Sequence, residues 1–377
     1  MKLIHTSDWH FGMPVGIGSL IPCQRYFLEQ MYRLIREQQV EAVLCAGDVY
    51  DSSVTNAEAI KLFNDAATTL CAELGVKFIL VAGNHDSAAR LASCRELLKS
   101  AGMYVTGKLE RDVEPVLLDG GKVAVYCLPW FARDEVAELF PERKEEIRSL
   151  DDAVRIVCDH IRQGMDKNRK NIVVSHAFIV GSELSDSDRA AKVGFASAVS
   201  ASVFEGFDYV ALGHIHKPQV IAPHIRYSGS PLKYSFGAEE KQEKGVVLVD
   251  TDTMEQQFIG LPMLRDRKSF TGTYEELMAL EGIEEDYLWM HVTDRYAGLE
   301  LQADMRRKFP YLLELYGKSL TEEGDLSALT VEQLQTMDET AIMVKFMEES
   351  FTYTPTGDQM ELFRLAVEKS SEEGDLG

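Results

Sequence analysis

Five short strings hold the residues of this chain that could do metal chemistry. They are DWH at Asp8 to His10, GDVYD at Gly47 to Asp51, GNHD at Gly83 to Asp86, SH at Ser175 to His176 and GHIH at Gly213 to His216. A two-metal hydrolase needs oxygen and imidazole ligands, one carboxylate that bridges the metals, and open positions for phosphate and water. Together the strings predict a two-metal phosphoesterase centre.

The spacing inside the strings supports this chemistry. Asp8 and His10 are two residues apart, as are His214 and His216, so in an extended segment both members of a pair project to the same side. Asp48 stands alone after a glycine, which suits a bridging role. The other predicted ligands are the amide oxygen of Asn84 and the imidazole of His176. The remaining histidines match no motif and are expected to be structural or surface residues: His5, His160, His224 and His291.

Each string follows a short apolar run that resembles a buried strand. The predicted strands are Lys2–Thr6, Ala42–Ala46, Lys77–Ala82, Val123–Leu128, Asn171–Ser175, Tyr209–Leu212 and Gly245–Asp250. Glycine directly precedes Asp48, Asn84 and His214, and it allows the chain to turn sharply out of a strand. The ligands are therefore expected at the carboxyl edge of a sheet, where α/β proteins place their sites.

Helical patterns alternate with these runs. The stretch Gln24–Gln38 carries an apolar stripe, Thr55 with Glu58 predicts a capping box for a helix that extends to about Gly75, and Ser149 begins another helix. This alternation predicts layered α/β architecture.

The pattern of predicted elements changes after residue 262. We expect a catalytic domain over 1–262 and a small α+β unit over 263–325, with a charged connection at Pro262–Lys268, a helix near Tyr274–Leu280, a strand at Tyr287–Val292 and a helix near Leu299–Phe309. A helical tail is expected over 326–377, with apolar residues at helical spacing on both sides of a break at 354–357.

Composition indicates the cellular location of the protein and the kinds of partner it can bind. The six cysteines are scattered without a CxxC pair, which indicates small buried side chains in a reducing cytoplasm. No signal peptide is expected, and no stretch reaches the roughly 18 apolar residues of a membrane span. The formal net charge of -22 argues against broad nonspecific nucleic-acid binding, but bound metals can reverse the local field of an acidic site.

The order DxH, GDxxD, GNHD, H, GHxH resembles the calcineurin-like metallophosphoesterase superfamily. Within it, the phrases TSDWHFG, CAGDVYD, VAGNHDS, ALGHIHKPQ and YSGSPLKYSFG are similar to the SbcD family of bacterial nuclease subunits, which is related to the eukaryotic double-strand-break repair nuclease. The resemblance is strong over roughly residues 1–260. It implies an αββα metallophosphoesterase sandwich with a small α+β capping domain and a C-terminal helical tail.

The resemblance also implies roles for the residues. One metal would be held by Asp8, His10, Asp48 and His216, and the second by Asp48, Asn84, His176 and His214. His85 would be the general acid or transition-state stabiliser, with Asp86 orienting it. The metals implied are two divalent ions, most consistent with Mn²⁺. Asp51 stands where archaeal and eukaryotic relatives have a histidine, which favours a structural role for it over a catalytic one.

The implied activity is that of a manganese-dependent DNA nuclease, a double-strand exonuclease and single-strand or hairpin endonuclease in DNA end processing, replication and recombination. Its implied partners are DNA ends and hairpins, an SbcC-type SMC-like ATPase bound by the C-terminal helices, and a second copy of the chain. The implied location is the cytoplasm, in association with the nucleoid. A stand-alone small-molecule phosphodiesterase or phosphatase remains the alternative. Serine/threonine phosphatases are disfavoured, because Ser52 and Ser53 stand where their GDxVDRG motif has arginine and glycine.

Two further expectations concern surfaces. Basic residues in loops near the motifs are candidates for DNA phosphate contacts: Arg90, Arg189, Lys192, Lys217 and Lys233. The helices at Tyr26–Ile35 and Ala59–Leu70 could supply a dimer interface, or they could face the sheet.

Overall fold

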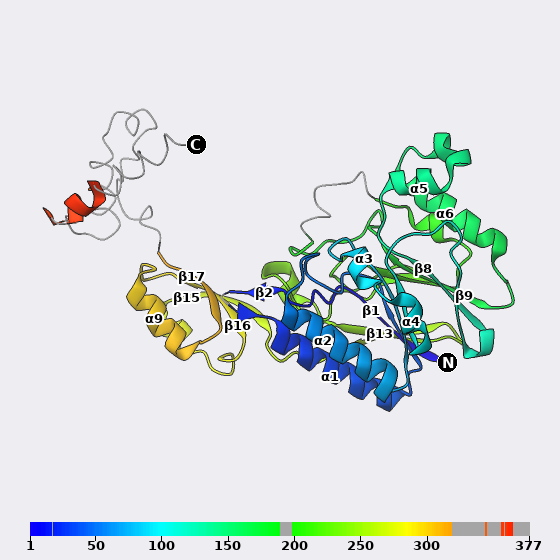
Figure 1. The fold of residues 1–377 in the computed structure, drawn as a ribbon. Helices are drawn as coiled ribbons and strands as arrows, with labels where there is room; N and C mark the ends of the chain where they lie inside the picture. The colour runs from blue at the N-terminus through cyan, green and yellow to red at the C-terminus, as the bar shows by residue number, and fades with distance from the viewer. Residues whose placement is uncertain (17, 189–197, 319–343, 345–355, 358, 365–377) are drawn as a thin grey trace. The chain divides into compact units, whose positions relative to one another are not determined.

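The computed structural model describes residues 1–16, 18–188, 198–318, 344, 356–357 and 359–364 (Figure 1). Its contacts divide the chain into two compact units. The first consists of 1–269 with 285–289, and the second of 270–284 with 290–377. The predicted domain boundaries at 262 and 325 stay predictions. Most of the predicted C-terminal helical tail lies outside the described residues.

The first unit is built on two six-stranded sheets. The first sheet contains, in spatial order, β14 (Glu255–Gly260), β13 (Gly245–Asp250), β1 (Lys2–Thr6), β4 (Ala42–Cys45), β5 (Lys77–Val81) and β6 (Met103–Thr106). Strands β1, β4, β5 and β6 are parallel, whereas β13 and β14 are antiparallel to their neighbours. The ends of β1, β4 and β5 therefore meet at one edge.

The second sheet contains, in spatial order, β11 (Gln219–Ala222), β12 (Ile225–Tyr227), β10 (Tyr209–Gly213), β9 (Lys170–His176), β8 (Val123–Leu128) and β7 (Val116–Leu118). Strands β8, β9, β10 and β12 are parallel. A short hairpin of β2 (Pro14–Val15) and β3 (Gly18–Ser19) follows β1.

The helices lie over the outer faces of the sheets (Figure 1). On the first sheet they are α1 (Ile21–Gln38), α2 (Ala57–Thr68) with a π turn at Thr69–Glu73, α3 (Ala88–Leu91) and α4 (Arg95–Ser100). On the second they are α5 (Arg133–Leu139) and α6 (Leu150–Gly164). Short 3₁₀ turns lie at Asp119–Gly121, Pro141–Glu146, Ala201–Phe204 and Gly237–Lys241.

Alternating side chains divide the core into layers, because successive residues of a strand face opposite sides. Leu3, Leu44, Ile79, Val174 and Ala211 lie between the two sheets. On the outer face of the second sheet, other strand residues pack against α5 and α6 in a separate apolar cluster. This helix–sheet–sheet–helix order confirms the predicted layered αββα fold.

Aromatic contacts join the first sheet to its helices. The ring of Trp9 stacks on Phe78 of β5, with centroids 5.7 Å apart, and meets Phe27 of α1 at 6.1 Å. Phe63 of α2 also lies beside Phe78. Of the two alternatives for α1 and α2, this packing fits the one in which their apolar faces cover the sheet.

The remaining elements are β15 (Arg267–Gly272), α8 (Tyr274–Met278), β16 (Tyr287–Val292), α9 (Leu299–Lys308) and β17 (Leu312–Tyr316). The three strands form a sheet in the order β15-β16-β17. The predicted helices and the strand at Tyr287–Val292 are present. However, the predicted connection at Pro262–Lys268 is wrong at its end, because β15 begins at Arg267.

One helix start also differs from the prediction. Asn56, not Thr55, caps α2, because its side chain accepts a hydrogen bond from the backbone N–H of Ala59 at 2.8 Å. The hydroxyl of Thr55 instead donates to the carbonyl of Ser52. Ser149 caps α6 as predicted, in a capping box with Asp152. Among the described residues, no helix is both long and apolar enough to cross a membrane.

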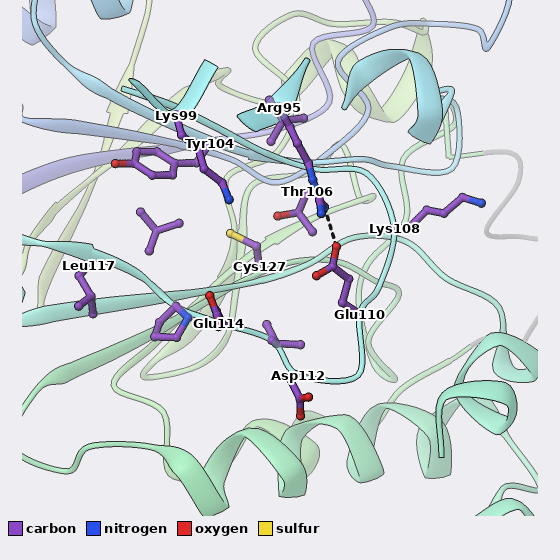
Figure 2. Close-up of a pocket in the computed structure, with 14 residues that line it drawn as sticks. Arg95, Lys99, Tyr104, Thr106, Lys108, Glu110, Asp112, Glu114, Leu117 and Cys127 are labelled. Carbon is purple, nitrogen blue, oxygen red and sulfur yellow. Dashed lines mark ion pairs between the residues drawn. The ribbon is translucent and has the colours of Figure 1, made fainter. Parts of the chain in front are cut away.

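A hollow of about 530 Å³ lies beside the edge strands β6 and β7, and Figure 2 shows the residues that line it. Tyr104 and Leu117 line it, and an ion pair between Arg95 and Glu110, 2.6 Å long, lies at its side. None of the predicted metal ligands lines this hollow, so it is separate from the site described next.

Candidate metal centre

The two sheets bring all five strings to one place. Asp8 follows β1, Asp48 follows β4 and Asn84 follows β5, all in the first sheet. His176 ends β9, and His214 and His216 follow β10 in the second sheet. Since these strands are parallel within each sheet, their carboxyl ends lie at the same edge.

The first ligand set contains Asp8, His10 and His216. All three are buried, and their ligand atoms lie within 4.8 Å of one another. The Nε2 atoms of His10 and His216 are 3.2 Å apart. Asp8 is fixed by the backbone N–H of His214, at 3.0 Å from Oδ1, and by the hydroxyl of Ser7, at 2.5 Å from Oδ2.

The second ligand set contains Asn84, His176 and His214. The Oδ1 atom of Asn84 lies 3.0 Å from Nε2 of His176 and 3.0 Å from Nδ1 of His214, and these two nitrogens are 3.3 Å apart. His176 Nδ1 lies 2.8 Å from the carbonyl oxygen of Ala46. Because that carbonyl can only accept, His176 carries a proton on Nδ1 and directs Nε2 into the set.

Asp48 lies between the two sets. Its Oδ2 atom is 3.8 Å from Nε2 of His10 and 3.4 Å from Nε2 of His176. Its Oδ1 atom accepts a hydrogen bond from the backbone N–H of His85 at 2.9 Å. The carboxylate is thus placed where one group can serve both sets, which is the role that the sequence predicts for it.

The donor atoms fit divalent cations. Imidazole nitrogens converge within both sets, with the carboxylate of Asp8 in the first set and the amide oxygen of Asn84 in the second, and acceptors that face one another away from water need a cation or a proton between them. Among the described residues no thiolate joins the groups of His, Asp and Glu that could hold an ion. Nitrogen and oxygen ligands of this kind suit divalent cations.

The backbone at the site is strained. Asp8, His10, Asp48 and His214 all have positive φ angles, of 54°, 44°, 50° and 101°. This conformation is uncommon for residues other than glycine, and such strain concentrates at functional sites. The neighbouring glycines leave space for the ligands: a Cβ on Gly47 would lie 2.4 Å from Nδ1 of His176, and one on Gly83 would lie 2.0 Å from Oδ1 of Asp48.

Burial and the carboxylates set the protonation of the ligands in the metal-free protein. Burial lowers the pKa of His176, but the carboxylates of Asp48 and Asp8 and the carbonyl of Ala46 together outweigh it and raise this pKa to about 9. Burial lowers the pKa of His214 to about 3 and that of His216 well below its usual value. Two imidazoles are therefore ready to bind a cation at neutral pH, whereas His176 must first lose a proton.

His85 lies at the edge of the two sets. Its Nδ1 atom is 2.8 Å from the backbone carbonyl oxygen of Asp51, so Nδ1 donates and Nε2 is left to exchange a proton with a substrate. The ring is only partly buried. It meets the ring of His10 edge-on, with centroids 4.9 Å apart.

Asp86 has partners other than the ring of His85, which the sequence predicts it to orient. Its oxygens accept hydrogen bonds from three backbone N–H groups, those of Gly83 at 2.8 Å, Tyr50 at 2.9 Å and Val49 at 3.2 Å. Burial, and then the carboxylate of Asp48, raise the pKa of Asp86 to about 6. Asp86 joins the loop after β4 to the loop after β5, and the ring of His85 is held instead by the backbone of Asp51.

Asp51 has a second contact that sequence reasoning did not find. Its Oδ1 atom lies 3.4 Å from Nδ1 of His10, and its carboxylate forms a third group of possible metal ligands with His10 and His85. This favours a supporting role, in which Asp51 turns Nε2 of His10 towards His216. The signal in the sequence was only its position in GDVYD.

The candidate DNA contacts differ in their surroundings. Arg90 is exposed and donates to the carbonyl of Ser53, and Lys217 forms an ion pair with Glu183. Lys233 is buried, and its ammonium group donates to Asp266 at 2.7 Å and to the carbonyl of Glu240, which gives it a structural role. Arg189 and Lys192 lie outside the described residues.

Two aromatic neighbours complete the surroundings of the site. His5 is fully buried, with Nδ1 2.8 Å from the hydroxyl of Tyr209 and Nε2 3.0 Å from the carbonyl oxygen of Leu212, as expected of a structural residue. Tyr234 was missed by sequence reasoning. Its hydroxyl lies 2.9 Å from the carbonyl oxygens of both Asp8 and Trp9 and so supports the backbone of the first ligand set.

Comparison with known proteins agrees with this geometry. A family model described as calcineurin-like phosphoesterase matches residues 1–218, more than half of the chain. The chain therefore belongs to the calcineurin-like phosphoesterases.

Curated relatives narrow the class further. The SbcD subunit of the nuclease SbcCD from Staphylococcus epidermidis is 33% identical over 282 residues, which are 74% of this chain and 74% of that protein. The protein of the same name from Staphylococcus saprophyticus is 30% identical over 367 residues, 96% of this chain and 94% of that one. Within the phosphoesterases, the chain is thus a member of the SbcD family of nuclease subunits. A solved structure, TT1561 of Thermus thermophilus, aligns with 69% of this chain and 98% of its own at 12% identity and a TM-score of 0.40.

Proposed function

We propose that this chain is the nuclease subunit of an SbcCD-type complex and hydrolyses phosphodiester bonds of DNA with two divalent cations. The observation that carries the proposal is the pair of adjacent ligand sets on either side of Asp48, assembled from the ends of strands in both sheets. A paired site of this kind suits the in-line displacement at phosphorus that phosphodiesterases perform.

The residues that would hold the cations follow from the two sets. Asp8, His10, Asp48 and His216 would hold one, and Asp48, Asn84, His176 and His214 the other. The metals, when bound, supply Lewis acidity and an activated water. We assign Mn²⁺ to both positions, because the ligands mix imidazole, carboxylate and amide oxygen without thiolate.

His85 would move the proton that the leaving group requires. With Nδ1 bound to the carbonyl of Asp51, its Nε2–H can donate to the departing sugar oxygen when the ring is protonated. Asp51 thereby fixes the direction in which His85 gives its proton, and the same residue keeps His10 turned inward.

The substrate we propose is DNA at ends and hairpins. The acidic balance of the chain, with a net charge of -22, supplies little general attraction for a polyanion. Affinity would come from the two metals, from exposed cations such as Arg90, and from an ATPase partner. The name SbcCD of the relatives implies such a second subunit for those proteins.

The test of the activity is cleavage by the purified chain of a hairpin DNA and a blunt duplex with Mn²⁺, in the presence and absence of its ATPase partner and ATP. We expect cleavage of both DNAs, stimulated by the partner. The Asp48→Asn variant should cut neither, because it removes the shared carboxylate. Hydrolysis of a small phosphodiester without any DNA cleavage under all these conditions would instead support a stand-alone phosphodiesterase.

We further propose that residues 326–377 bind the ATPase partner, that 263–325 orient DNA, and that the nuclease subunit acts as a homodimer. Deleting residues 330–377 should abolish co-purification with the partner, while Mn²⁺-dependent hydrolysis of a small phosphodiester persists. Unimpaired co-purification would contradict the first of these proposals. The dimer is tested by sedimentation of the full chain.

A further inference from the structure

We propose that Ser187, Glu239 and Lys244 act as positioning residues that fix the tautomer of His216, so that its Nε2 atom is free to bind a cation. The Oγ atom of Ser187 lies 2.7 Å from Nδ1 of His216 and 2.9 Å from Oε2 of Glu239. The Nζ atom of Lys244 lies 2.6 Å from Oε1 of Glu239. These contacts form an unbroken relay of polar groups from a buried lysine to a predicted metal ligand.

The direction of the hydrogen bonds in this relay depends on the charge state of Glu239. Its side chain and that of Lys244 are both 0% exposed, and their contact is the shortest that either makes. A buried ammonium group beside a carboxylate favours the ionised form of both. Oε2 also accepts hydrogen bonds from the backbone N–H of Ser235 at 2.9 Å and from its hydroxyl at 2.7 Å. Glu239 is therefore a carboxylate, which accepts hydrogen bonds and donates none.

The protons of the relay can then be counted. Ser187 has one hydroxyl hydrogen, and Oε2 of Glu239 can receive it but cannot return one. The same oxygen of Ser187 must consequently accept the hydrogen bond from His216, so Nδ1 of His216 carries the ring proton. A neutral imidazole holds only one such proton, which leaves a lone pair on Nε2, the atom 3.2 Å from Nε2 of His10.

Lys244 and the neighbouring Asp188 also hold the backbone of His216. Lys244 donates to the carbonyl oxygen of His216 at 2.8 Å and to the hydroxyl of Ser230 at 3.0 Å. Asp188, next to Ser187 in the chain, accepts the backbone N–H of His216 at 3.0 Å. The ring nitrogen, the N–H and the C=O of one residue are thus each held by a side chain.

Burying an ion pair is expensive, and the attraction between the two charges does not always offset the desolvation of both. The Glu239–Lys244 pair lies between the carbonyl of His216 and the hydroxyl of Ser187, which contacts the ring of the same histidine. This position indicates a role beyond stability. Partners behind metal-binding histidines typically alter metal affinity by about 10–100-fold when they are removed. The partner of His216 is a side-chain hydroxyl, whereas that of His176 is a backbone carbonyl. Because a side chain can be substituted and a backbone carbonyl cannot, the relay can be tested by mutation.

The inference rests on the metal centre proposed above, and its test is arranged so that the two can fail separately. Three variants of the full chain are compared with the unmodified chain: Ser187→Ala, which removes the hydroxyl; Ser187→Thr, which keeps it; and Ser182→Ala as the matched control. Ser182 belongs to the same segment, but its hydroxyl donates to the carbonyl of Ile179 at 2.7 Å and takes no part in the relay.

The first measurement is the tautomer of His216 in the metal-free protein at about pH 7.5, from long-range ¹H–¹⁵N spectra of histidine-labelled chain. The second is the affinity for Mn²⁺ by isothermal titration calorimetry. In the unmodified chain, in Ser187→Thr and in Ser182→Ala we expect a single Nδ1–H tautomer. In Ser187→Ala we expect a mixture of tautomers and a fall in affinity of about 10–100-fold at one of two sites.

Retention of the single Nδ1–H tautomer in Ser187→Ala overturns the proposal, whatever the affinity. An Nε2–H tautomer in the unmodified chain overturns it as well, and this measurement needs no variant to fold. If the unmodified chain shows the expected tautomer but binds no Mn²⁺, the relay stands and the proposed function fails.

Discussion

The backbone N–H of His85 donates to Oδ1 of Asp48 at 2.9 Å, so the residue proposed to move a proton is tied to the residue proposed to bridge the metals. The contact uses the main chain of His85 and leaves its ring free. It also joins the loop after β4 to the loop after β5. Changes to the ring of His85 should therefore leave the ligand sets intact, which separates proton transfer from metal binding in an experiment.

We expect His85→Gln to lower the rate of DNA cleavage by about 10²–10⁴-fold, the usual contribution of a general acid. Its affinity for Mn²⁺ should remain close to that of the unmodified chain, because no ring atom of His85 belongs to either ligand set. Single-turnover cleavage and calorimetry measure the two quantities. Cleavage at the normal rate would show that another group protonates the leaving oxygen.

Gly83→Ala tests the space that the bridging carboxylate requires. The new Cβ would lie 2.0 Å from Oδ1 of Asp48, so either the carboxylate or the strand end must move. We expect Mn²⁺ affinity to fall by at least about tenfold while the far-ultraviolet circular dichroism stays unchanged. Gly164→Ala is the matched control, since a Cβ there meets no atom within 4 Å. Equal affinities in the two variants would contradict the assignment of Asp48.

Asp86 should matter for stability more than for chemistry. Asp86→Ala leaves the N–H groups of Gly83, Tyr50 and Val49 without their acceptor, and we expect it to lower the free energy of unfolding by about 3–5 kcal/mol. Asp86→Asn keeps one acceptor oxygen and should lose roughly half as much. Urea unfolding of the metal-free chain gives both values. A loss of cleavage without a loss of stability would instead return Asp86 to a role beside His85.

Metal binding should weaken as the pH falls. Asp48 raises the pKa of His176 to about 9 in the metal-free protein, so below that pH a cation must displace a proton from this ring. Apparent affinity should decrease by about tenfold for each pH unit just below about 9 and level off above it. At lower pH the decrease should steepen, because the carboxylates of Asp51, Asp48 and Asp8 outweigh burial and raise the pKa of His10 as well. Asp48 adds nothing to this dependence near neutrality, because His176 holds the pKa of its carboxylate well below the usual range.

Calorimetry in buffers of different ionisation enthalpy measures the proton released in this exchange. His176→Asn replaces the imidazole with a neutral amide and should reduce the number of protons released on binding by about one between about pH 6 and 8, although its affinity is lower throughout. A slope that this substitution leaves unchanged would place the titrating group elsewhere.

Much of this molecule could be predicted because its strands have a clear apolar pattern. β1, β8 and β13 have the predicted bounds, since each is a short strand that is buried along almost its whole length and rich in aliphatic residues. The meeting of the ligands was predictable for the same reason: each stands directly behind such a run, and parallel strands end at one edge.

The contacts that could not be predicted are those between loops that lie far apart in the sequence. Asp86 is three residues from Gly83 but also contacts the loop after β4, 36 and 37 residues away in the sequence. The contact of Ser187 with Glu239 spans 52 residues, and nothing in the spacing of either segment indicates it. The starts of α2 and β15 were missed because capping and pairing partners, not the apolar pattern, decide these boundaries.

The ligand sets take residues from both sheets, since Asp8 and Asp48 follow strands of the first, and His176 and His216 lie at strand ends of the second. A cation held by both would connect distant parts of the chain in the way that a disulfide does, and none of the six cysteines forms one. Chelators would then act as reductants act on a disulfide-bonded protein, loosening the sandwich itself as well as its chemistry. The same cations would then serve both as the cofactor and as a cross-link between the two sheets.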